Sequence, residues 1–212
     1  MRSVIFGAGT YGQVYLAYLQ EAGVEVVGFI DDDPTIQGSL VGGIPVIGNH
    51  ESLKDLKQQY NLEAFYCPLG NNQLRVKFME MAKDAGFALP NYIHPSVVLS
   101  PHVTIGEGVY ILLGTHIMPH TLIKDYVMIS MGVNVAHHVI LEKGVFLSTG
   151  CNFGASIVAR EKAYCGISST IMTGIHELGK NCLIGAGAVV IHDVPDNAVM
   201  AGVPAKCLKF KD

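Results

Sequence analysis

The histidines of this chain are the side chains best suited to chemistry, and their spacing sorts them into groups. His102, His120 and His138 stand eighteen residues apart, and His137 directly precedes the last of these three. A neutral imidazole can take up a proton near neutral pH or bind a transition metal. Because this histidine column offers neither a carboxylate nor a thiolate, we expect a solvated or interface ladder and no metal site.

A glycine-rich loop near the start of the chain has the residue types that bind phosphate. Gly7-Ala-Gly-Thr-Tyr-Gly12 lies between a predicted strand and a predicted helix. There glycines let the backbone close on a phosphate, and the amino terminus of the helix offers N–H donors. Asp31, Asp32 and Asp33 follow the second strand, where a dinucleotide-binding fold places an acid for the ribose hydroxyls. A tight turn with solvated acids is the alternative that these residues leave open.

Residues 1–92 are predicted to form the small α/β domain that positions this loop. Strands are expected at residues 4–6, 25–30, 44–47 and 64–68, and helices at residues 13–22, 50–60 and 73–85. The alternation of strand and helix predicts a Rossmann-like parallel sheet with helices on its faces. Because a complete dinucleotide fold needs more residues, a lone glycine loop is weak support for NAD binding.

Residues 93–212 follow a period of six, which positions the histidines. Every sixth residue from Leu99 to Ile171 is apolar, and every sixth residue from Val97 to Ser169 is small or β-branched. Such a repeat predicts a parallel β-helix, in which each unit supplies a short strand and a turn and inward residues stack from coil to coil. Three units make a triangular coil, so we expect roughly five coils at a strand spacing of about 4.8 Å. A second outward column consists of His116, Asn134 and Asn152.

The end of the repeat is irregular. After Ile171 the phase slips by one residue, which predicts an inserted residue and a bulge near His176 and Glu177. The segment from Asp193 to Lys206 contains two prolines and is predicted to leave the β-helix as a C-terminal tail.

Composition and charge exclude several classes of protein. The chain has 212 residues, of which 50% are hydrophobic and 15% charged, and its net charge is −4. Without a cluster of Lys and Arg, neither nucleic acid nor an acidic membrane is expected as a partner. The amino terminus turns glycine-rich too soon for a secretory signal, and no run reaches the roughly 20 apolar residues of a membrane span, so a cytoplasmic protein is expected. The five cysteines lack the spacing of a zinc site or a disulfide framework and are interpreted as reduced packing residues.

The chain resembles the sialic acid O-acetyltransferases and the bacterial nucleotide-4-amino-sugar N-acetyltransferases in the order of its motifs. These are the glycine loop, the acidic strand end, Pro68-Leu-Gly-Asn-Asn-Gln-Leu-Arg75, Ile93-His-Pro-Ser96, the six-residue array and Gly202-Val-Pro-Ala-Lys206. The likeness covers nearly the whole chain. It implies a left-handed β-helix, a homotrimer, a nucleotide sugar held by the amino-terminal domain, and acetyl-CoA lying along the β-helix between neighbouring subunits.

The resemblance implies a catalytic role for His137. It aligns with the histidine that takes a proton from the acceptor amine or hydroxyl as this group attacks the thioester. The family follows that base with Glu or Asp, whereas this chain has His138, and a protonated His138 would oppose proton uptake by His137. Another acid or Asn134 is then expected to orient the ring, or the activity has drifted. The alternative is an exposed histidine pair at a corner of the coil.

Ligand contacts are also implied by the resemblance. For the nucleotide sugar they are Gly9, Thr10, Tyr11, Asp31, Asp32 and Gly70. For coenzyme A they are Phe146, Ala155, Ile167, Ala186 and Lys206. Phe146 stands where relatives can place a histidine beside the thioester, so backbone N–H groups are expected to polarise the acetyl carbonyl. Lys206 is expected to reach the phosphates of coenzyme A.

The sequence therefore predicts direct transfer of an acetyl group from acetyl-CoA to an amino or hydroxyl group of a nucleotide-linked or sialic-acid-type sugar. His137 is the expected general base. Cys151 and Cys165 occupy inward registers, which argues against a covalent enzyme intermediate. Two alternatives stay open: a β-helix scaffold that binds nucleotide sugars and has lost the chemistry, and an NAD-dependent sugar-modifying enzyme.

Overall fold

The computed structural model describes residues 1–211, which divide into two compact units. The first unit is Met1–Pro90 and the second begins at Asn91. The boundary expected from the sequence lay after residue 92. No helix within the described residues has both the length and the apolarity required to cross a bilayer.

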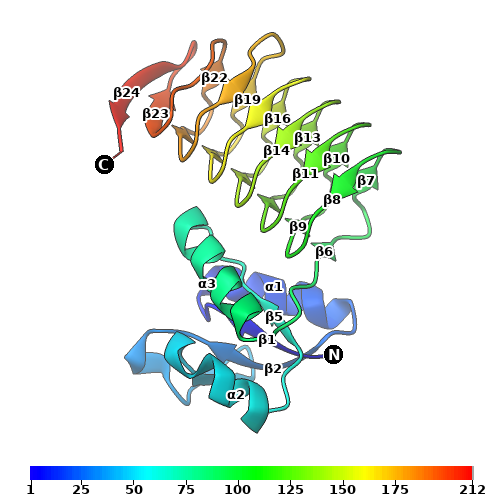
Figure 1. Cartoon of the computed structure of the whole chain (residues 1–212), viewed down its shortest axis with the longest axis vertical. Helices are drawn as coiled ribbons and strands as arrows, with labels where there is room; N and C mark the ends of the chain where they lie inside the picture. The colour runs from blue at the N-terminus through cyan, green and yellow to red at the C-terminus, as the bar shows by residue number, and fades with distance from the viewer. Residues whose placement is uncertain (212) are drawn as a thin grey trace. The chain divides into compact units, whose positions relative to one another are not determined.

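The amino-terminal unit is a mixed sheet with the strand order β3-β4-β2-β1-β5, flanked by helices (Figure 1). The strands are β1 (Arg2–Phe6), β2 (Glu25–Ile30), β3 (Leu40–Val41), β4 (Ile44–Gly48) and β5 (Ala64–Tyr66). The helices are α1 (Thr10–Glu21), α2 (Leu53–Gln59) and α3 (Asn72–Asp84), with 3-10 turns η1 (Pro34–Ile36) and η2 (His50–Ser52). The Rossmann-like alternation of strand and helix is thus present.

One strand departs from the expected parallel sheet. β3 pairs antiparallel with β4 across Gly42 and Gly43, which have φ values of 56° and 79°. A two-residue hairpin needs such left-handed backbone at its turn, and glycine adopts it without steric cost. The central strands are buried on both faces, and Ile5, Phe29 and Phe65 are fully buried.

The second unit is a left-handed parallel β-helix of triangular coils (Figure 1). Face 1 contains β7 (Val98–Leu99), β10 (His116–Ile117), β13 (Asn134–Val135), β16 (Asn152–Phe153), β19 (Thr170–Ile171) and β22 (Val189–Val190). Face 2 contains β8 (Thr104–Ile105), β11 (Leu122–Ile123), β14 (Ile140–Leu141), β17 (Val158–Ala159) and β20 (Glu177–Leu178). Face 3 contains β6 (Tyr92–Ile93), β9 (Tyr110–Ile111), β12 (Met128–Ile129), β15 (Phe146–Leu147), β18 (Tyr164–Cys165), β21 (Leu183–Ile184), β23 (Ala198–Ala201) and β24 (Lys206–Phe210).

The two inward registers of the period fill the core of this β-helix. Ile129, Leu141 and Leu147 are fully buried and belong to one continuous hydrophobic cluster. The hydroxyls of the buried Thr115 and Thr121 donate to backbone carbonyl oxygens, at 2.9 and 3.1 Å, which satisfies these polar groups inside the core. The period of six is therefore confirmed as a packing period.

The predicted slip in phase is confirmed. Ile140 pairs with Val158, eighteen residues later, whereas Val158 pairs with Glu177, nineteen residues later. The extra residue lies in the turn before Glu177, where Thr173 and Ile175 form an isolated bridge. One added residue in a turn widens a corner while both flanking strands keep their partners.

The end of the chain stays in the sheet of face 3 instead of leaving as a tail. β23 pairs parallel with β21, and β24 turns back antiparallel along β23. The turn contains Gly202, with a φ of 98°, and Pro204. Two prolines interrupt the six-residue pattern without ending the strand pairing, because they fall in turns and outside the paired residues.

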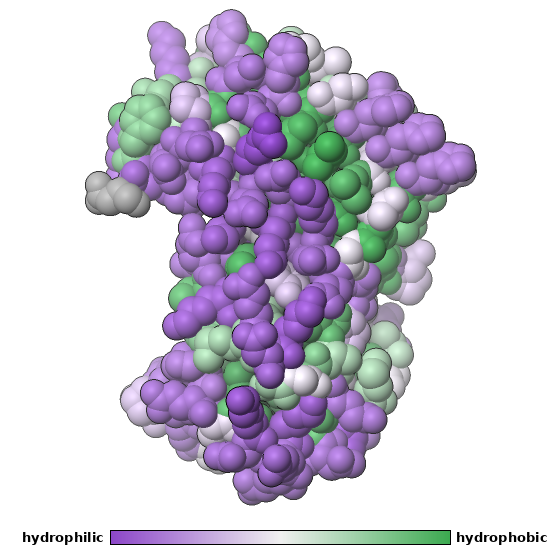
Figure 2. All heavy atoms as spheres, viewed as in Figure 1, coloured by the Kyte–Doolittle hydropathy of each residue, from purple (hydrophilic) through white to green (hydrophobic). Residues whose placement is uncertain are grey.

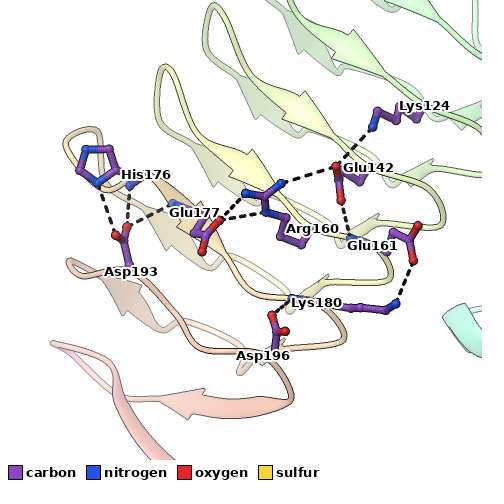
Figure 3. Close-up of polar contacts among 9 residues, drawn as sticks. All are labelled: Lys124, Glu142, Arg160, Glu161, His176, Glu177, Lys180, Asp193 and Asp196. Carbon is purple, nitrogen blue, oxygen red and sulfur yellow. Dashed lines mark hydrogen bonds and ion pairs between the residues drawn. The ribbon is translucent and has the colours of Figure 1, made fainter.

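Figure 3 shows a ladder of alternating charges on face 2. Lys124 lies 3.3 Å from a carboxylate oxygen of Glu142, and Arg160 lies 3.8 Å from the same oxygen. The other partner of Arg160 is Glu177, at 2.7 Å, and the hydrogen bond from this guanidinium to the carboxylate raises the pKa of Arg160. These cations have acidic partners within the chain, so face 2 is poorly suited to bind an anionic ligand.

The cysteines give a first prediction. Cys67, Cys151, Cys165 and Cys182 are buried and Cys207 is exposed, with no disulfide in the described part of the chain. Burial raises the pKa of the Cys182 thiol to about 12. Since the thiolate is the reactive form, we expect the aromatic disulfide DTNB to label the native protein rapidly at Cys207 alone. Cys207→Ser should remove this rapid phase, and a second rapidly reacting thiol in that variant would contradict the burial pattern.

Candidate active site

The corner between β13 and β14 carries His137 and His138. Both side chains are exposed, and His138 has a φ of 57°, in the left-handed region that lets the chain turn from face 1 to face 2. The N–H of His138 donates to the carbonyl of Pro119 on the preceding coil, at 3.2 Å. The carbonyl of His137 accepts from the N–H of Ser156 on the next coil, at 3.0 Å. Both neighbouring coils therefore fix the backbone of this corner.

The two imidazoles contact each other through like nitrogens. Nδ1 of His137 lies 3.0 Å from Nδ1 of His138, and the rings stand at 89° to each other. A hydrogen bond between two nitrogens needs one donor and one acceptor, so one proton lies between them. The pair therefore couples the tautomer of one ring to that of the other.

The predicted histidine column is confirmed. The rings of His102 and His120 stack with their centroids 5.1 Å apart and an angle of 1° between their planes. The rings of His120 and His138 are 4.8 Å apart and tilted by 35°. Nowhere in residues 1–211 does a group of three or more His, Cys, Asp or Glu side chains have an arrangement that could hold a metal ion.

A groove of about 420 Å³ runs along face 1 beside this corner. Its floor contains the second predicted column, in which His116 pairs with Asn134 and Asn134 pairs with Asn152. The amide nitrogen of Asn134 donates to Oδ1 of Asn152 at 2.9 Å, and Asn152 donates to the carbonyl of Gly150 at 3.1 Å. The amide nitrogen of Asn134, expected to orient the ring of His137, thus donates to another amide.

Three residues expected to contact coenzyme A border face 1. Ala155 lies at the same corner as His137, one coil further on, in the turn between β16 and β17. Ile167 and Ala186 are exposed at the opposite corner, between faces 3 and 1, and the N–H of Gly187 donates to the carbonyl of Ile167 at 2.8 Å. The groove therefore lies between the histidine corner and an apolar corner.

Two further expected contacts belong to face 3. Phe146 is almost fully buried and stacks on Tyr164, with ring centroids 5.0 Å apart. Lys206 is exposed at the start of β24. Within one chain, the structure therefore groups His137, His138 and Asn134 around face 1 and separates them from Phe146 and Lys206.

Exposed apolar side chains accompany these polar columns. Figure 2 shows hydrophobic residues gathered in a patch over the β-helix, bordered by hydrophilic ones. Among the residues that line the groove, Met118 and Met172 are 46% and 47% exposed. A groove with amide groups on its floor and methionines on its walls suits a ligand that is partly apolar and carries amide groups.

In the amino-terminal unit, the expected nucleotide contacts lie at a crevice of the sheet. The chain runs from β1 outward through β2 to β4 and returns past β1 to β5, so the strand order reverses between β1 and β5. Ligands of such sheets bind outside the carboxyl ends of the strands at this reversal. The glycine loop follows β1, and Gly70 follows β5. A Cβ at Gly7 would lie 2.9 Å from the side chain of Leu69, which places the two loops side by side.

The carboxylates of the first two acids after β2 accept hydrogen bonds from groups of the chain itself. Oδ2 of Asp31 accepts from the N–H of Ala8 in the glycine loop at 2.7 Å, and its Oδ1 accepts from the N–H of Asp33 at 2.9 Å. Oδ1 of Asp32 lies 2.7 Å from Nδ1 of His50 and accepts from its backbone N–H at 3.1 Å. His50 belongs to none of the sequence motifs; it follows β4, the neighbour of β2 in the sheet.

Two glycines of the loop give a matched prediction. A Cβ at Gly12 would lie 1.9 Å from the carbonyl oxygen of Gly7, whereas within residues 1–211 no atom other than those of Gly9 and its two chain neighbours lies within 4 Å of a Cβ at Gly9. Gly12→Ala should therefore lower the free energy of unfolding by about 1–3 kcal/mol, the usual cost of overpacking. Gly9→Ala should change it by less than about 0.5 kcal/mol. Urea unfolding followed by circular dichroism compares them, and equal effects would contradict the close approach at Gly12.

Comparisons with known proteins agree with this architecture. Residues 2–82 match the family model described as the PglD N-terminal domain. A GDP-perosamine N-acetyltransferase from Caulobacter crescentus, solved with CoA and GDP-perosamine, is 34% identical with a TM-score of 0.91. The alignment covers 99% of this chain and 97% of that one. That enzyme was solved with both molecules bound after one of its histidines had been replaced by alanine or by asparagine.

Two further relatives extend these matches. The acetyltransferase domain of PglB from Neisseria gonorrhoeae, solved with acetyl coenzyme A, is 29% identical with a TM-score of 0.87, and the alignment covers 98% of each chain. A protein of Acanthamoeba polyphaga mimivirus is 31% identical over 109 residues, which is 51% of this chain and 20% of that protein. The match thus spans about a fifth of the length of the curated relatives.

Proposed function

Because the chain belongs to the bacterial nucleotide-amino-sugar N-acetyltransferases, we propose that it transfers the acetyl group of acetyl-CoA to an amino group of a nucleotide-linked sugar. The observation that carries this proposal is the full-length likeness to an enzyme solved with CoA and GDP-perosamine. An acceptor amine is favoured over a hydroxyl because the solved relative from Caulobacter crescentus is named as an N-acetyltransferase. The likeness extends over both units of the chain, which favours the transferase over the NAD-dependent alternative.

His137 is the general base of this proposal. The amine lone pair attacks the thioester carbonyl, the C–N bond forms, and one proton of the amine moves to Nε2 of His137. The C–S bond then breaks, and the coenzyme A thiolate leaves and recovers that proton. Two observations support His137: it is exposed at the corner beside the groove of face 1, and its Nδ1 is occupied by His138.

The two ligands are proposed to occupy the two sites described above. The crevice after β1 and β5 takes the nucleotide, with Gly9, Thr10, Tyr11 and Gly70 closest to its phosphates. Asp31 and Asp32 shape this crevice through Ala8 and His50. The groove of face 1 takes the pantetheine arm of coenzyme A, whose amide groups match the asparagines on its floor.

A homotrimer completes the proposed site. Lys206 is exposed on face 3 of the chain, so it reaches a ligand on face 1 only from a neighbouring copy, whereas the side chain of Phe146 is almost fully buried within its own chain. Sedimentation equilibrium at micromolar protein concentration should give three times the mass of the chain, and a monomer with full activity would contradict this assembly. A cytoplasmic compartment stays a prediction of the sequence.

A screen of nucleotide sugars tests the activity directly. The protein is incubated with acetyl-CoA and UDP- or GDP-linked amino sugars, with the corresponding hydroxyl sugars as matched controls, and release of the coenzyme A thiol is followed. The Cys207→Ser variant is used because it lacks the exposed protein thiol that would otherwise react with DTNB, the reagent that detects the coenzyme A thiol. We expect release with at least one amino sugar and none with its hydroxyl counterpart. Ligand-induced thermal stabilisation without thiol release from any sugar would instead favour the scaffold alternative.

A further inference from the structure

We propose that His138 is a positioning residue that sets the tautomer of His137. The inference rests on the proposed function, since it concerns the base of that reaction. Its geometric basis is the 3.0 Å contact between the two Nδ1 atoms. A general base needs its lone pair on the nitrogen that faces the substrate, so the position of a single proton decides whether His137 can act.

The direction of this hydrogen bond follows from the reaction. When Nδ1–H of His137 donates to the lone pair on Nδ1 of His138, the lone pair of His137 lies on Nε2 and can accept the proton of the amine. In the opposite direction, Nε2 of His137 carries the proton and the ring is no base. After His137 accepts the substrate proton it is an imidazolium, which donates from Nδ1 and is stabilised by the same acceptor.

This arrangement requires a neutral His138. A protonated His138 donates from its own Nδ1 and therefore forces the proton of His137 onto Nε2. The pair thus loses its activity by protonation of either ring, whereas a carboxylate in the place of His138 stays an acceptor throughout the neutral range.

The surroundings hold the backbone and the ring of His138 in place. Its backbone φ of 57° and its hydrogen bond to Pro119 hold the corner, and the ring of His120 packs 4.8 Å from its own. The titratable groups that face it along this edge are His137, His120 and, beyond His120, His102.

Three substitutions of His138 change its hydrogen-bond acceptor without disturbing the backbone of the corner. Glycine and asparagine both tolerate the left-handed backbone of position 138, and aspartate does so nearly as well. His138→Gly removes the acceptor, His138→Asn keeps a neutral acceptor oxygen at the position of Nδ1, and His138→Asp provides a charged one. We expect a loss of about 10- to 100-fold in kcat for His138→Gly, the range found when an orienting partner is removed. His138→Asn should restore kcat to within about fivefold of the unsubstituted enzyme.

The pH profile distinguishes a positioning role from a structural one. His138→Asp should move the acid limb of kcat/KM to higher pH by about one unit relative to His138→Asn, because a carboxylate stabilises the imidazolium of His137. These two side chains have the same shape, so a difference between their midpoints reports the charge at position 138 and not its packing. Equal midpoints, or a His138→Gly enzyme with full kcat, would overturn the proposal.

A spectroscopic measurement of the two tautomers tests this inference without requiring that the protein be active. Nitrogen-15 NMR of the histidine-labelled protein at neutral pH distinguishes a protonated Nδ1 from a protonated Nε2, and His137→Gln identifies the signals of His137. We expect a protonated Nδ1 on His137 and a protonated Nε2 on His138. The reverse pattern would refute the proposed direction even in an active enzyme. If no sugar accepts an acetyl group, the proposed function fails while the NMR signals still report the tautomers.

Discussion

His137→Ala should lower kcat for acetyl transfer by about 10²- to 10⁴-fold, the usual contribution of a general base. The reason is that the amine must lose a proton as the C–N bond forms, and in the proposed site Nε2 of His137 is the group that receives this proton. Because the imidazole acts on the reacting nitrogen and holds neither the nucleotide nor the pantetheine arm, KM should change little.

Binding measurements accompany this variant. Calorimetric Kd values for coenzyme A and for the nucleotide sugar should stay within about threefold, as a related enzyme with a replaced histidine still holds CoA and GDP-perosamine. His102→Asn is the control, because it replaces another exposed histidine, at a left-handed position that asparagine tolerates. Activity of His137→Ala within about tenfold of the unsubstituted enzyme, a barrier change of about 1.4 kcal/mol, would remove His137 from the role of essential base.

Leu141→Ala should lower the free energy of unfolding by about 2–5 kcal/mol, the range for removing a buried leucine side chain. Leu141 is fully buried in the core of the β-helix, between Ile123 and Ala159 on the adjoining strands. The coils above and below cannot close the resulting cavity without breaking their strand pairing, so both the lost transfer free energy and the cavity contribute.

Its neighbour on the same strand is the control. Ile140 faces outward from β14 and is half-buried, so Ile140→Ala should cost about 1 kcal/mol or less. Urea unfolding of the three proteins gives the comparison. A larger loss at Ile140 than at Leu141 would mean that the inward and outward registers have been exchanged.

The interior of the β-helix could be predicted from the sequence because it depends on a period alone. Residues eighteen apart stack on one another, so the inward registers from Leu99 to Ile171 and the column His102, His120 and His138 follow by counting. The same counting places Phe146 on a different face from Asn134. These stacking relations can be predicted without knowing the conformation of any side chain.

Other contacts depend on the order of strands or on ring orientation, which a period does not contain. The pair of Asp32 and His50 forms because β4 lies beside β2 in the sheet, a neighbour relation that the alternation of elements leaves open. β3 could not be predicted because it is an isolated strand of two residues, without the repetition that reveals the equally short strands of the β-helix. The contact between His137 and His138 joins adjacent residues, yet it depends on side-chain torsions that only the folded corner determines.

The charge ladder of face 2 has a consequence for how sequences of this kind diverge. The carboxylate of Glu142 lies between Lys124 and Arg160, so reversing any one sign places like charges within a few ångströms. Substitutions along this ladder are therefore expected to occur in compensating sets, at positions one coil apart, among natural variants of the chain. The separation of such coupled changes is expected to be eighteen before the bulge, as between Lys124 and Glu142, and seventeen across it, as between Arg160 and Glu177.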